Sequence, residues 1–212
     1  MTKDKVLEGL LASKAVAVIR MTDAAKLAKV AAALREGGVT ALEVTMTVPG
    51  AVEIIRAMAR EREAGVLIGA GTVLDVGTAL DVIAAGADFV VSPITDRDMI
   101  MACREADVLV VPGAFTPTEI VAAWRAGADI VKVFPATSLG PQFFRDLRGP
   151  LPHIRLMPTG GVSLENAREF LAAGACCVGI GTALLDKKMI DDDDWQALAS
   201  RARRLVESLR GL

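Results

Sequence analysis

The sequence predicts an α/β protein, a single-domain (β/α)8 TIM barrel that begins with a short N-terminal helix. Three observations predict this fold: strand-like and helix-like segments alternate, one helix-glycine-strand phrase recurs, and the chain has 212 residues. Alternating strands and helices require parallel strands, because a helical crossover returns the chain to the same edge of the sheet. Eight strand-helix units suit a closed barrel, whose lower length limit is about 200 residues.

The recurring phrase is a helix end, a glycine and then a short β-branched run. It occurs as "EGGVTALEV" from Glu36, "AAGADFVV" from Ala84, "RAGADIVKV" from Arg125 and "AAGACCVGI" from Ala172. Each phrase holds one glycine at the left-handed position that ends a helix, where the lack of a side chain removes the steric cost. These glycines are Gly38, Gly86, Gly127 and Gly174.

Eight segments rich in β-branched and apolar residues are predicted as strands. They are Ala15 to Arg20, Ala41 to Met46, Leu67 to Val73, Phe89 to Pro93, Val108 to Pro112, Ile130 to Phe134, Arg155 to Thr159, and Cys176 to Gly181. A segment with helical spacing follows each of the first seven, and a last helix is predicted from about Trp195 to Leu209. No linker divides the chain, so residues 1–212 are assigned to one barrel domain. An open doubly wound sheet is the alternative that the same alternation permits.

The composition argues against several classes of partner. Hydrophobic residues make up 52% and charged residues 24% of the chain, and the formal net charge is -2. Because the 24 basic residues are spread evenly, neither a nucleic-acid nor a membrane surface is predicted. No apolar stretch approaches the roughly 20 residues that a membrane-spanning helix needs. The opening "MTKDKVLEGLLASK" predicts an amphipathic helix rather than a secretory signal.

Three features could suggest metal binding and are interpreted otherwise. Cys103, Cys176 and Cys177 lack metal-ligand spacing and are interpreted as buried structural thiols of a cytoplasmic protein. The only histidine, His153, is expected at the surface or in packing. The run "IDDDD" at 190–194 is interpreted as a cap of the last helix, whose positive end favours carboxylates. Neither a metal site nor a cofactor is predicted.

Polar residues and glycines gather at the predicted carboxyl ends of the strands, where the loops of a barrel form its active site. The loops after the seventh and eighth strands begin "PTGG" and "GIGTALL". Such loops bind phosphate through backbone N–H groups freed by glycines and through the positive end of a short helix. The candidates are Thr159, Gly160, Gly161, Gly181 and Thr182. Glycines that only turn the chain are the alternative.

Two charged residues interrupt apolar strands. Side chains alternate between the two faces of a strand. In "ALEVTM" and the residue that follows it, Glu43 therefore shares a face with Thr45 and Thr47. In "DIVKVFPAT", Lys132 shares a face with Phe134. Barrel strands pack their outer face against helices, so both charges are expected to point inward near the open end. A structural ion pair and a catalytic pair both fit this pattern.

A desolvated lysine has a lowered pKa and becomes a nucleophile for ketones. The imine that Lys132 would form is an electron sink once protonated, so a neighbouring carbon–carbon bond can break. A retro-aldol cleavage then needs only a base, for which Glu43 is the candidate. An isomerase or epimerase that uses the two residues as acid and base is an alternative, as is a non-catalytic sugar-phosphate binding protein.

The chain resembles the class I aldolases of the 2-keto-3-deoxy-6-phosphogluconate (KDPG) and 2-keto-4-hydroxyglutarate (KHG) family. The resemblance covers about residues 15–185 and rests on the order and spacing of "GGVTALEVTMTVP", "GAGTV", "FVVSP", "VPGAFTPTE", "IVKVFPA", "GPQFFRDLRGPLP", "MPTGGV" and "VGIGTALL". It implies a compact barrel, usually a homotrimer, that cleaves KDPG reversibly to pyruvate and glyceraldehyde 3-phosphate without a cofactor.

The resemblance also implies roles for individual residues. It makes Lys132 the Schiff-base lysine and Glu43 the proton-transfer carboxylate. It places Thr72 and Pro93 at the pyruvate end, with Phe134 beside the lysine. The family's phosphate and substrate contacts fall on Thr159, Gly160, Gly161 and Thr182.

One position departs from the family pattern. Many members carry an arginine that holds the substrate carboxylate where this chain has Thr47 in "TMTVP". A carboxylate needs a cation or several donors, and we expect Arg20, at the end of "VAVIR", to reach the same pocket. Relatives that act on the galactonate epimer or on KHG use nearly the same barrel, so these substrates are alternatives. The phosphate loops favour a phosphorylated keto acid.

Overall fold

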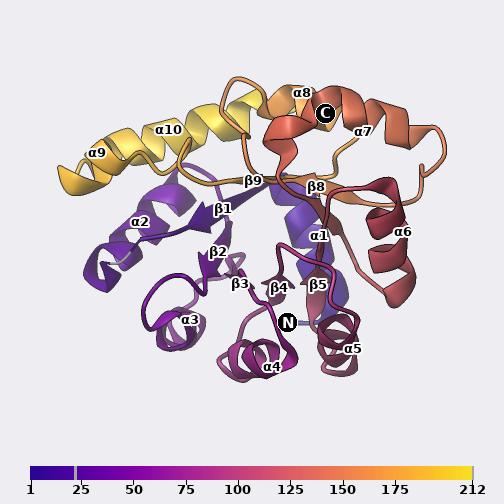
Figure 1. Ribbon diagram of the computed structural model, residues 1–212. Coiled ribbons are helices and arrows are strands. Elements are labelled where there is room, and N and C mark those ends of the chain that lie inside the picture. The colour runs from indigo at the N-terminus through magenta and orange to yellow at the C-terminus, as the bar shows by residue number, and fades with distance from the viewer. Residues whose placement is uncertain (22, 212) are drawn as a thin grey trace.

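Parallel strands form the inner wall of the protein, and helices surround them (Figure 1). The computed structural model describes residues 1–21 and 23–211. A six-stranded sheet has the order β5-β4-β3-β2-β1-β9, and a three-stranded sheet has the order β6-β7-β8. The strands are β1 (Ala15–Ile19), β2 (Ala41–Thr45), β3 (Leu67–Gly71), β4 (Phe89–Val91), β5 (Leu109–Val111), β6 (Gly113–Ala114), β7 (Val131–Val133), β8 (Leu156–Pro158) and β9 (Val178–Ile180).

The two sheets close into one barrel at two junctions. β5 lies within the fifth predicted strand, and β6 continues the same run beyond its predicted end at Pro112. The strand is interrupted at Pro112 because proline has no N–H to donate. β5 pairs with β4 and β6 pairs with β7, while the Lys132 N–H donates to the Pro112 carbonyl over 2.8 Å. At the other junction a parallel bridge joins Thr159 to Gly179. The prediction of a closed barrel is confirmed, and the alternative of an open doubly wound sheet is wrong.

Helices connect successive strands as predicted. They are α2 (Ala24–Glu36), α3 (Ala51–Arg60), α4 (Val76–Ala84), α5 (Arg97–Glu105), α6 (Pro117–Ala126), α7 (Gly140–Arg148) and α8 (Ala167–Ala172), with a 3-10 turn, η1 (Ala136–Ser138), before α7. α10 (Trp195–Ser208) follows the last strand, and a short helix that the sequence did not predict, α9 (Lys187–Asp191), precedes it. None of the helices in the described part of the chain is long and apolar enough to cross a membrane.

The predicted N-terminal helix, α1 (Lys3–Ser13), covers the amino-terminal end of the barrel. Val6 and Leu10 lie four residues apart, on one face, and are 2% and 1% exposed. They pack against the inward-facing side chains of the lower barrel, Val16, Ala41, Leu67, Phe89, Leu109, Ile130, Met157 and Cys177. The lower half of the barrel interior is therefore filled with apolar side chains.

Several local predictions can be tested in this fold. The four phrase glycines have φ values of 92°, 98°, 107° and 101°, as the left-handed position requires. His153 is exposed, and its ring meets the Trp124 ring edge-on at a centroid distance of 6.1 Å. Within "IDDDD", only Asp194 caps α10, by accepting from the Ala197 N–H over 2.9 Å, because Ile190 and Asp191 end α9 instead.

All three cysteines are free thiols. Cys103 and Cys177 are buried as predicted, whereas Cys176 is half-buried. Burial, with a smaller effect from Asp129, raises the pKa of the Cys103 thiol to about 11. A thiol in such surroundings is unreactive at neutral pH, which agrees with a structural role for Cys103.

Candidate active site

Two charged side chains point into the upper half of the barrel interior. Glu43 lies on β2 and Lys132 on β7, and they are 1% and 2% exposed. Their sequence neighbours Leu42 and Val131 instead join the apolar layer between strands and helices. This confirms the predicted alternation, and it places both charges inside the barrel, above the apolar lower half.

The Glu43 carboxylate occupies space that a glycine leaves free. A Cβ at Gly71, on the neighbouring strand β3, would collide with Oε1 of Glu43. Neither carboxylate oxygen has a hydrogen-bond partner among the described residues. Burial raises the pKa of the Glu43 carboxyl, and the charges of Lys132 and Arg20 offset part of that rise. A buried carboxylate without a partner is costly for stability, which is typical of a functional group.

The Lys132 ammonium is also held in unfavourable surroundings. Burial lowers the pKa of Lys132, the charge of Glu43 opposes this effect, and the charge of Arg20 adds to it. Lys132 Nζ lies 4.9 Å from the centroid of the Phe134 ring. In the part of the chain that the structure describes, no ion pair joins Lys132 to Glu43. The geometry therefore does not support the alternative of a structural ion pair.

A cavity of about 190 Å³ opens at the carboxyl ends of β1, β7, β8 and β9. It brings together seven of the predicted site residues: Arg20, Phe134, Thr159, Gly160, Gly161, Gly181 and Thr182. Gly160 and Gly161 have φ values of 85° and 75°, and the backbone N–H groups of Gly160, Gly161 and Thr182 donate to no other described residue. Successive free N–H groups of this kind form an anion-binding concavity.

Both loops of this cavity lead directly into helical turns. α8 begins at Ala167 and α9 at Lys187, but the Ala167 N–H donates to the Ser163 carbonyl over 3.0 Å and the Leu185 N–H donates to the Gly181 carbonyl over 2.9 Å. The Ser163 N–H in turn donates to Asn166 Oδ1 over 2.8 Å. A contribution of a helix end to anion binding stays a prediction beside the free loop N–H groups.

Thr159 and Arg20 are two polar side chains of this cavity that have no partner among the described residues. Thr159 Oγ1 is buried and has no hydrogen-bond partner among the described residues. Arg20 is exposed and forms no hydrogen bond or ion pair within residues 1–21 and 23–211. Its charge nevertheless acts on both Glu43 and Lys132, so it lies at the entrance to the two buried groups.

Thr47 lies outside the cavity and its hydroxyl is already engaged. Thr45 Oγ1 donates to the Ile19 carbonyl over 3.3 Å, and the two threonine hydroxyls lie 2.6 Å apart. Because the Thr45 hydroxyl already donates its hydrogen to the Ile19 carbonyl, the Thr47 hydroxyl must donate to Thr45 Oγ1. This chain of hydroxyls ties the end of β2 to the residue that precedes Arg20. Sequence reasoning noted Thr45 but missed this role, since only the register of β1 against β2 reveals it.

The two remaining predicted residues also lie outside the cavity, at the ends of neighbouring strands. Thr72 has a φ of 58°, a strained conformation for a β-branched residue. Bonds on both sides hold it, from the Met46 N–H to Gly71 O and from the Val73 N–H to Val91 O. Strain of this kind concentrates at functional sites. Pro93 is half-buried after β4, and its backbone packs against Gly113.

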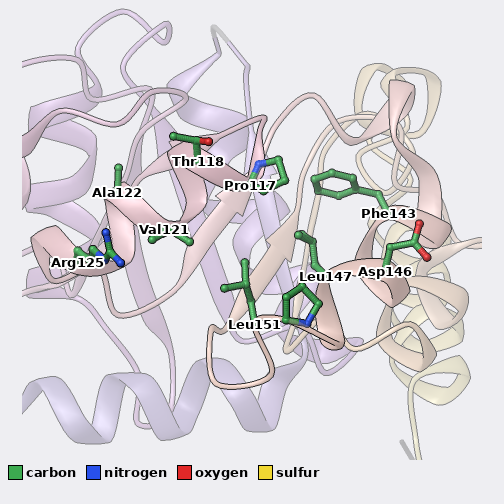
Figure 2. Close-up of a pocket in the computed structure, with 10 residues that line it drawn as sticks. Pro117, Thr118, Val121, Ala122, Arg125, Phe143, Asp146, Leu147 and Leu151 are labelled. Carbon is green, nitrogen blue, oxygen red and sulfur yellow. The ribbon is translucent and has the colours of Figure 1, made fainter.

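Two other hollows lie on the surface of the barrel. One, of about 690 Å³, lies on the outer wall between α6 and α7, as Figure 2 shows, and its charged residues Arg125 and Asp146 are both exposed. A second, of about 480 Å³, adjoins the site and shares Arg20 and Thr182 with it. Within residues 1–21 and 23–211, no three His, Cys, Asp or Glu side chains form a group that could hold a metal ion.

Comparisons with known proteins agree on one family. A family model described as "KDPG and KHG aldolase" matches residues 6–200. A 2-dehydro-3-deoxy-phosphogluconate aldolase from Pseudomonas aeruginosa is 38% identical over 192 residues, which cover 90% of this chain and 86% of that protein.

Two solved structures share the fold over most of the chain. The KDPG aldolase of Legionella pneumophila, with pyruvate captured at low pH as a covalent carbinolamine intermediate, has a TM-score of 0.87 and 29% identity over 94% of this chain and 97% of that one. A cube-shaped, porous protein cage designed by fusing symmetric oligomeric domains has a TM-score of 0.84 and 27% identity over 92% of this chain and 72% of that one.

Proposed function

Since the chain belongs to the KDPG and KHG aldolase family, we propose that it is a carbon–carbon lyase that reversibly cleaves KDPG to pyruvate and glyceraldehyde 3-phosphate. One observation carries this proposal: Lys132 is buried inside the barrel with a lowered pKa and without an ion pair to Glu43 among the described residues. A lysine in that state is poised to attack a ketone.

The two buried groups account for the reaction. The neutral amine of Lys132 attacks the C2 carbonyl of the substrate, and loss of water gives an imine. Once protonated, the imine accepts the electron pair of the C3–C4 bond as that bond breaks. Glu43 removes the C4 hydroxyl proton, so glyceraldehyde 3-phosphate leaves and an enamine stays on Lys132. Protonation at C3 and hydrolysis then release pyruvate and restore the free amine.

The surroundings of Glu43 suit a group that must both accept and return this proton. A general base works best when its pKa is near the operating pH. Burial raises the pKa of Glu43 from the ordinary carboxylate range toward that condition. The missing hydrogen-bond partner leaves both oxygens available to the substrate.

We assign the phosphate to the cavity that holds Thr159, Gly160, Gly161, Gly181 and Thr182. Its free N–H groups and the unpartnered Thr159 hydroxyl supply the donors that a phosphate needs. Phe134 lines this cavity, and the centroid of its ring lies 4.9 Å from Lys132 Nζ. Thr72 and Pro93, at the ends of β3 and β4, are assigned to the pyruvyl end.

We assign the substrate carboxylate to Arg20. Its guanidinium has no partner in the described chain and acts electrostatically on both Glu43 and Lys132, whereas the Thr47 hydroxyl is bonded to Thr45. Arg20→Ala is expected to raise the Kd for pyruvate by roughly 10-fold or more, the loss of a charged hydrogen bond. An unchanged Kd would remove Arg20 from this role.

The cellular setting is part of the same proposal. We expect the enzyme to act in the cytoplasm, as a step of the Entner–Doudoroff pathway, and to form a homotrimer. Its three unpaired cysteines support the location, and its likeness to a cage built from symmetric oligomeric domains supports self-association. The galactonate epimer and KHG are the competing substrates.

Borohydride reduction in the presence of pyruvate tests the covalent step. The expected product is a stable pyruvyl adduct located on Lys132 by peptide mass spectrometry, and absence of the adduct would favour an isomerase or epimerase. A coupled pyruvate-release assay with KDPG, its galactonate epimer and KHG then fixes the substrate. We expect the highest kcat/KM for KDPG. A preference for KHG, which has no phosphate, would contradict the assignment of the anion-binding loops.

A further inference from the structure

One loop of the cavity assigned to phosphate is held from behind by an arginine. Arg201, on α10, donates from Nε and Nη2 to the Ala183 carbonyl over 2.9 and 2.7 Å. Ala183 directly follows Thr182, which lines the cavity. α10 lies beside α9 and α2 (Figure 1). The two bonds therefore tie the loop after β9 to a helix that lies outside the cavity.

The loop after β9 forms a tight turn whose hydrogen bonds leave two N–H groups free. The N–H groups of Leu184 and Leu185 both donate to the Gly181 carbonyl over 2.9 Å. Those of Thr182 and Ala183 donate to no other described residue. The first N–H groups of a helical turn have no partner within the turn, so these two are available to a ligand.

Two successive peptide groups connect Arg201 to the free N–H of Thr182. The guanidinium donates to the Ala183 carbonyl, and the same peptide group donates through the Leu184 N–H to the Gly181 carbonyl. The peptide group of Gly181 ends in the Thr182 N–H. Because a trans peptide group is planar, with its C=O and N–H pointing in opposite directions, each bond orients the next N–H. Hydrogen bonds in such a chain also polarise one another, which makes the last N–H a stronger donor.

The first donor in this chain is a permanent cation. Arginine stays charged throughout the physiological pH range, and hydrogen bonds from a charged donor are roughly twice as strong as those between neutral groups. Arg201 is half-buried, so water screens its charge only in part. Within residues 1–21 and 23–211, no carboxylate forms an ion pair with it. Its side-chain bonds therefore act on the loop carbonyl.

The other loop of the cavity is held by a residue of its own. Asn166 Nδ2 donates to the Gly161 carbonyl over 2.9 Å, and Asn166 Oδ1 accepts from the Ser163 N–H over 2.8 Å. In the loop after β9, "GTALLD", only Thr182 and Asp186 have polar side chains. Thr182 lines the cavity, and Asp186 caps α9. This loop therefore depends on a donor from a distant helix.

We propose that Arg201 is a positioning residue of the phosphate site, which orients and strengthens the Thr182 N–H through the turn after β9. The inference rests on the proposed function, because that assignment supplies the phosphate. Arg201 does not line the cavity, so its effect reaches a ligand only through the turn. Its removal should weaken phosphate binding and leave the chemistry at Lys132 and Glu43 unchanged.

The test compares full-length variants that each change one arginine of α10. Arg201→Met removes the charge and both bonds, whereas Arg201→Lys keeps the charge and can donate to the same carbonyl. The control is Arg204→Met, because the Arg204 side chain is exposed and has no hydrogen bond or ion pair in the described chain. The pKa of Glu165 is lowered first by its hydrogen bond to Ser163 and further by the charges of both arginines. Each Met variant therefore removes a charge that acts on the same carboxylate.

Two measurements separate phosphate binding from the covalent chemistry. Titration with inorganic phosphate, followed at the Thr182 amide signal by NMR, gives the affinity at the turn itself. For Arg201→Met we expect the Kd for phosphate and the KM for KDPG each to rise about 10-fold, with kcat within about twofold of the wild type. Arg201→Lys should recover affinity to within about threefold. Exchange of the pyruvate methyl protons with deuterium, which needs Lys132 and Glu43 but no phosphate, should keep its wild-type rate.

Several results would overturn the proposal. They are a wild-type Thr182 signal that does not respond to phosphate, an unchanged Kd in folded Arg201→Met, and an equal loss of affinity in Arg204→Met. A matching loss of pyruvate exchange would also overturn it, because Arg201 would then support the whole site.

Circular dichroism reports whether each variant folds. If Arg201→Met does not fold, Arg201→Gln, which keeps an amide donor without the charge, should raise the Kd for phosphate about threefold, and an unchanged Kd would overturn the proposal. A wild type that binds phosphate at Thr182 but releases no pyruvate from KDPG would refute the aldolase assignment alone.

Discussion

The two halves of the barrel interior are built from the same strands but have opposite chemistry. The lower half is filled by side chains such as Leu67, Phe89 and Leu109, and α1 closes it with Val6 and Leu10. The upper half holds Glu43 and Lys132, both almost fully buried, and neither has an ion pair in the described chain. One half stabilises the fold, whereas the other half holds charges at a cost in stability.

Under the proposed assignment of Lys132 and Glu43, this difference reflects a loss of stability that makes the two groups reactive. An isolated buried charge costs several kcal/mol, and the group shifts its pKa toward the neutral form. Burial pushes the pKa of Lys132 down and that of Glu43 up, so both groups are driven toward their uncharged states. An uncharged lysine is a nucleophile, so the same unfavourable surroundings that weaken the fold prepare the amine for attack.

The largest effect is expected from Lys132→Met, which replaces the amine by an apolar side chain of similar length. Without the amine no imine forms, and kcat/KM for KDPG should fall roughly 10⁴-fold or more, about 5 kcal/mol in activation free energy. The melting temperature should not fall, because a buried charge is removed. Steady-state pyruvate release and thermal melting measure the two quantities. A variant that keeps a tenth of the activity would place the nucleophile elsewhere.

The converse effect is expected in the lower half from Leu10→Ala. Leu10 is 1% exposed against the base of the barrel, and truncation of a buried leucine costs about 2 to 5 kcal/mol of unfolding free energy. The proposed catalytic groups, Lys132 and Glu43, lie in the other half of the barrel, so kcat/KM should stay within about twofold of the wild type. Urea denaturation gives the first quantity. A large loss of activity in the folded variant would show that the two halves are coupled.

Much of this division could be predicted from the sequence because it is local. Alternation along "ALEVTM" and "DIVKVFPAT" was sufficient to place Glu43 and Lys132 on the inner face, and the phrase glycines marked the ends of helices. Both signals depend only on residues a few positions apart. The closed barrel also followed, because alternating strands and helices leave few ways to bury both faces of a parallel sheet.

The features that the sequence did not reveal depend on contacts between distant segments. Gly71, on the neighbouring strand β3, leaves room for the Glu43 side chain. The hydrogen bond from the Thr45 hydroxyl to the Ile19 carbonyl depends on the register of β1 against β2.

The smallest effect tests the cause of the lysine's reactivity through the pH dependence of stability. The comparison is between Glu43→Gln and the double variant Glu43→Gln/Lys132→Met. Both variants lack the Glu43 carboxylate, which raises the pKa of Lys132, so only burial and the charge of Arg20 remain to lower that pKa. Between that lowered pKa and the ordinary value near 10.5, the unfolded chain binds a proton at Lys132 and the folded chain does not.

In this window the free energy of unfolding of Glu43→Gln should therefore rise with pH relative to the double variant, by at most about 1.4 kcal/mol per pH unit. Below the window both states are protonated, so the full cost of the buried charge persists and the two curves become parallel. Urea denaturation at a series of pH values provides both curves, and other titrating groups cancel in their difference. Curves that stay parallel up to pH 10.5 would mean that Lys132 is solvated as an ordinary lysine. The two halves of the barrel interior would then not differ in how they shift the pKa of this buried group.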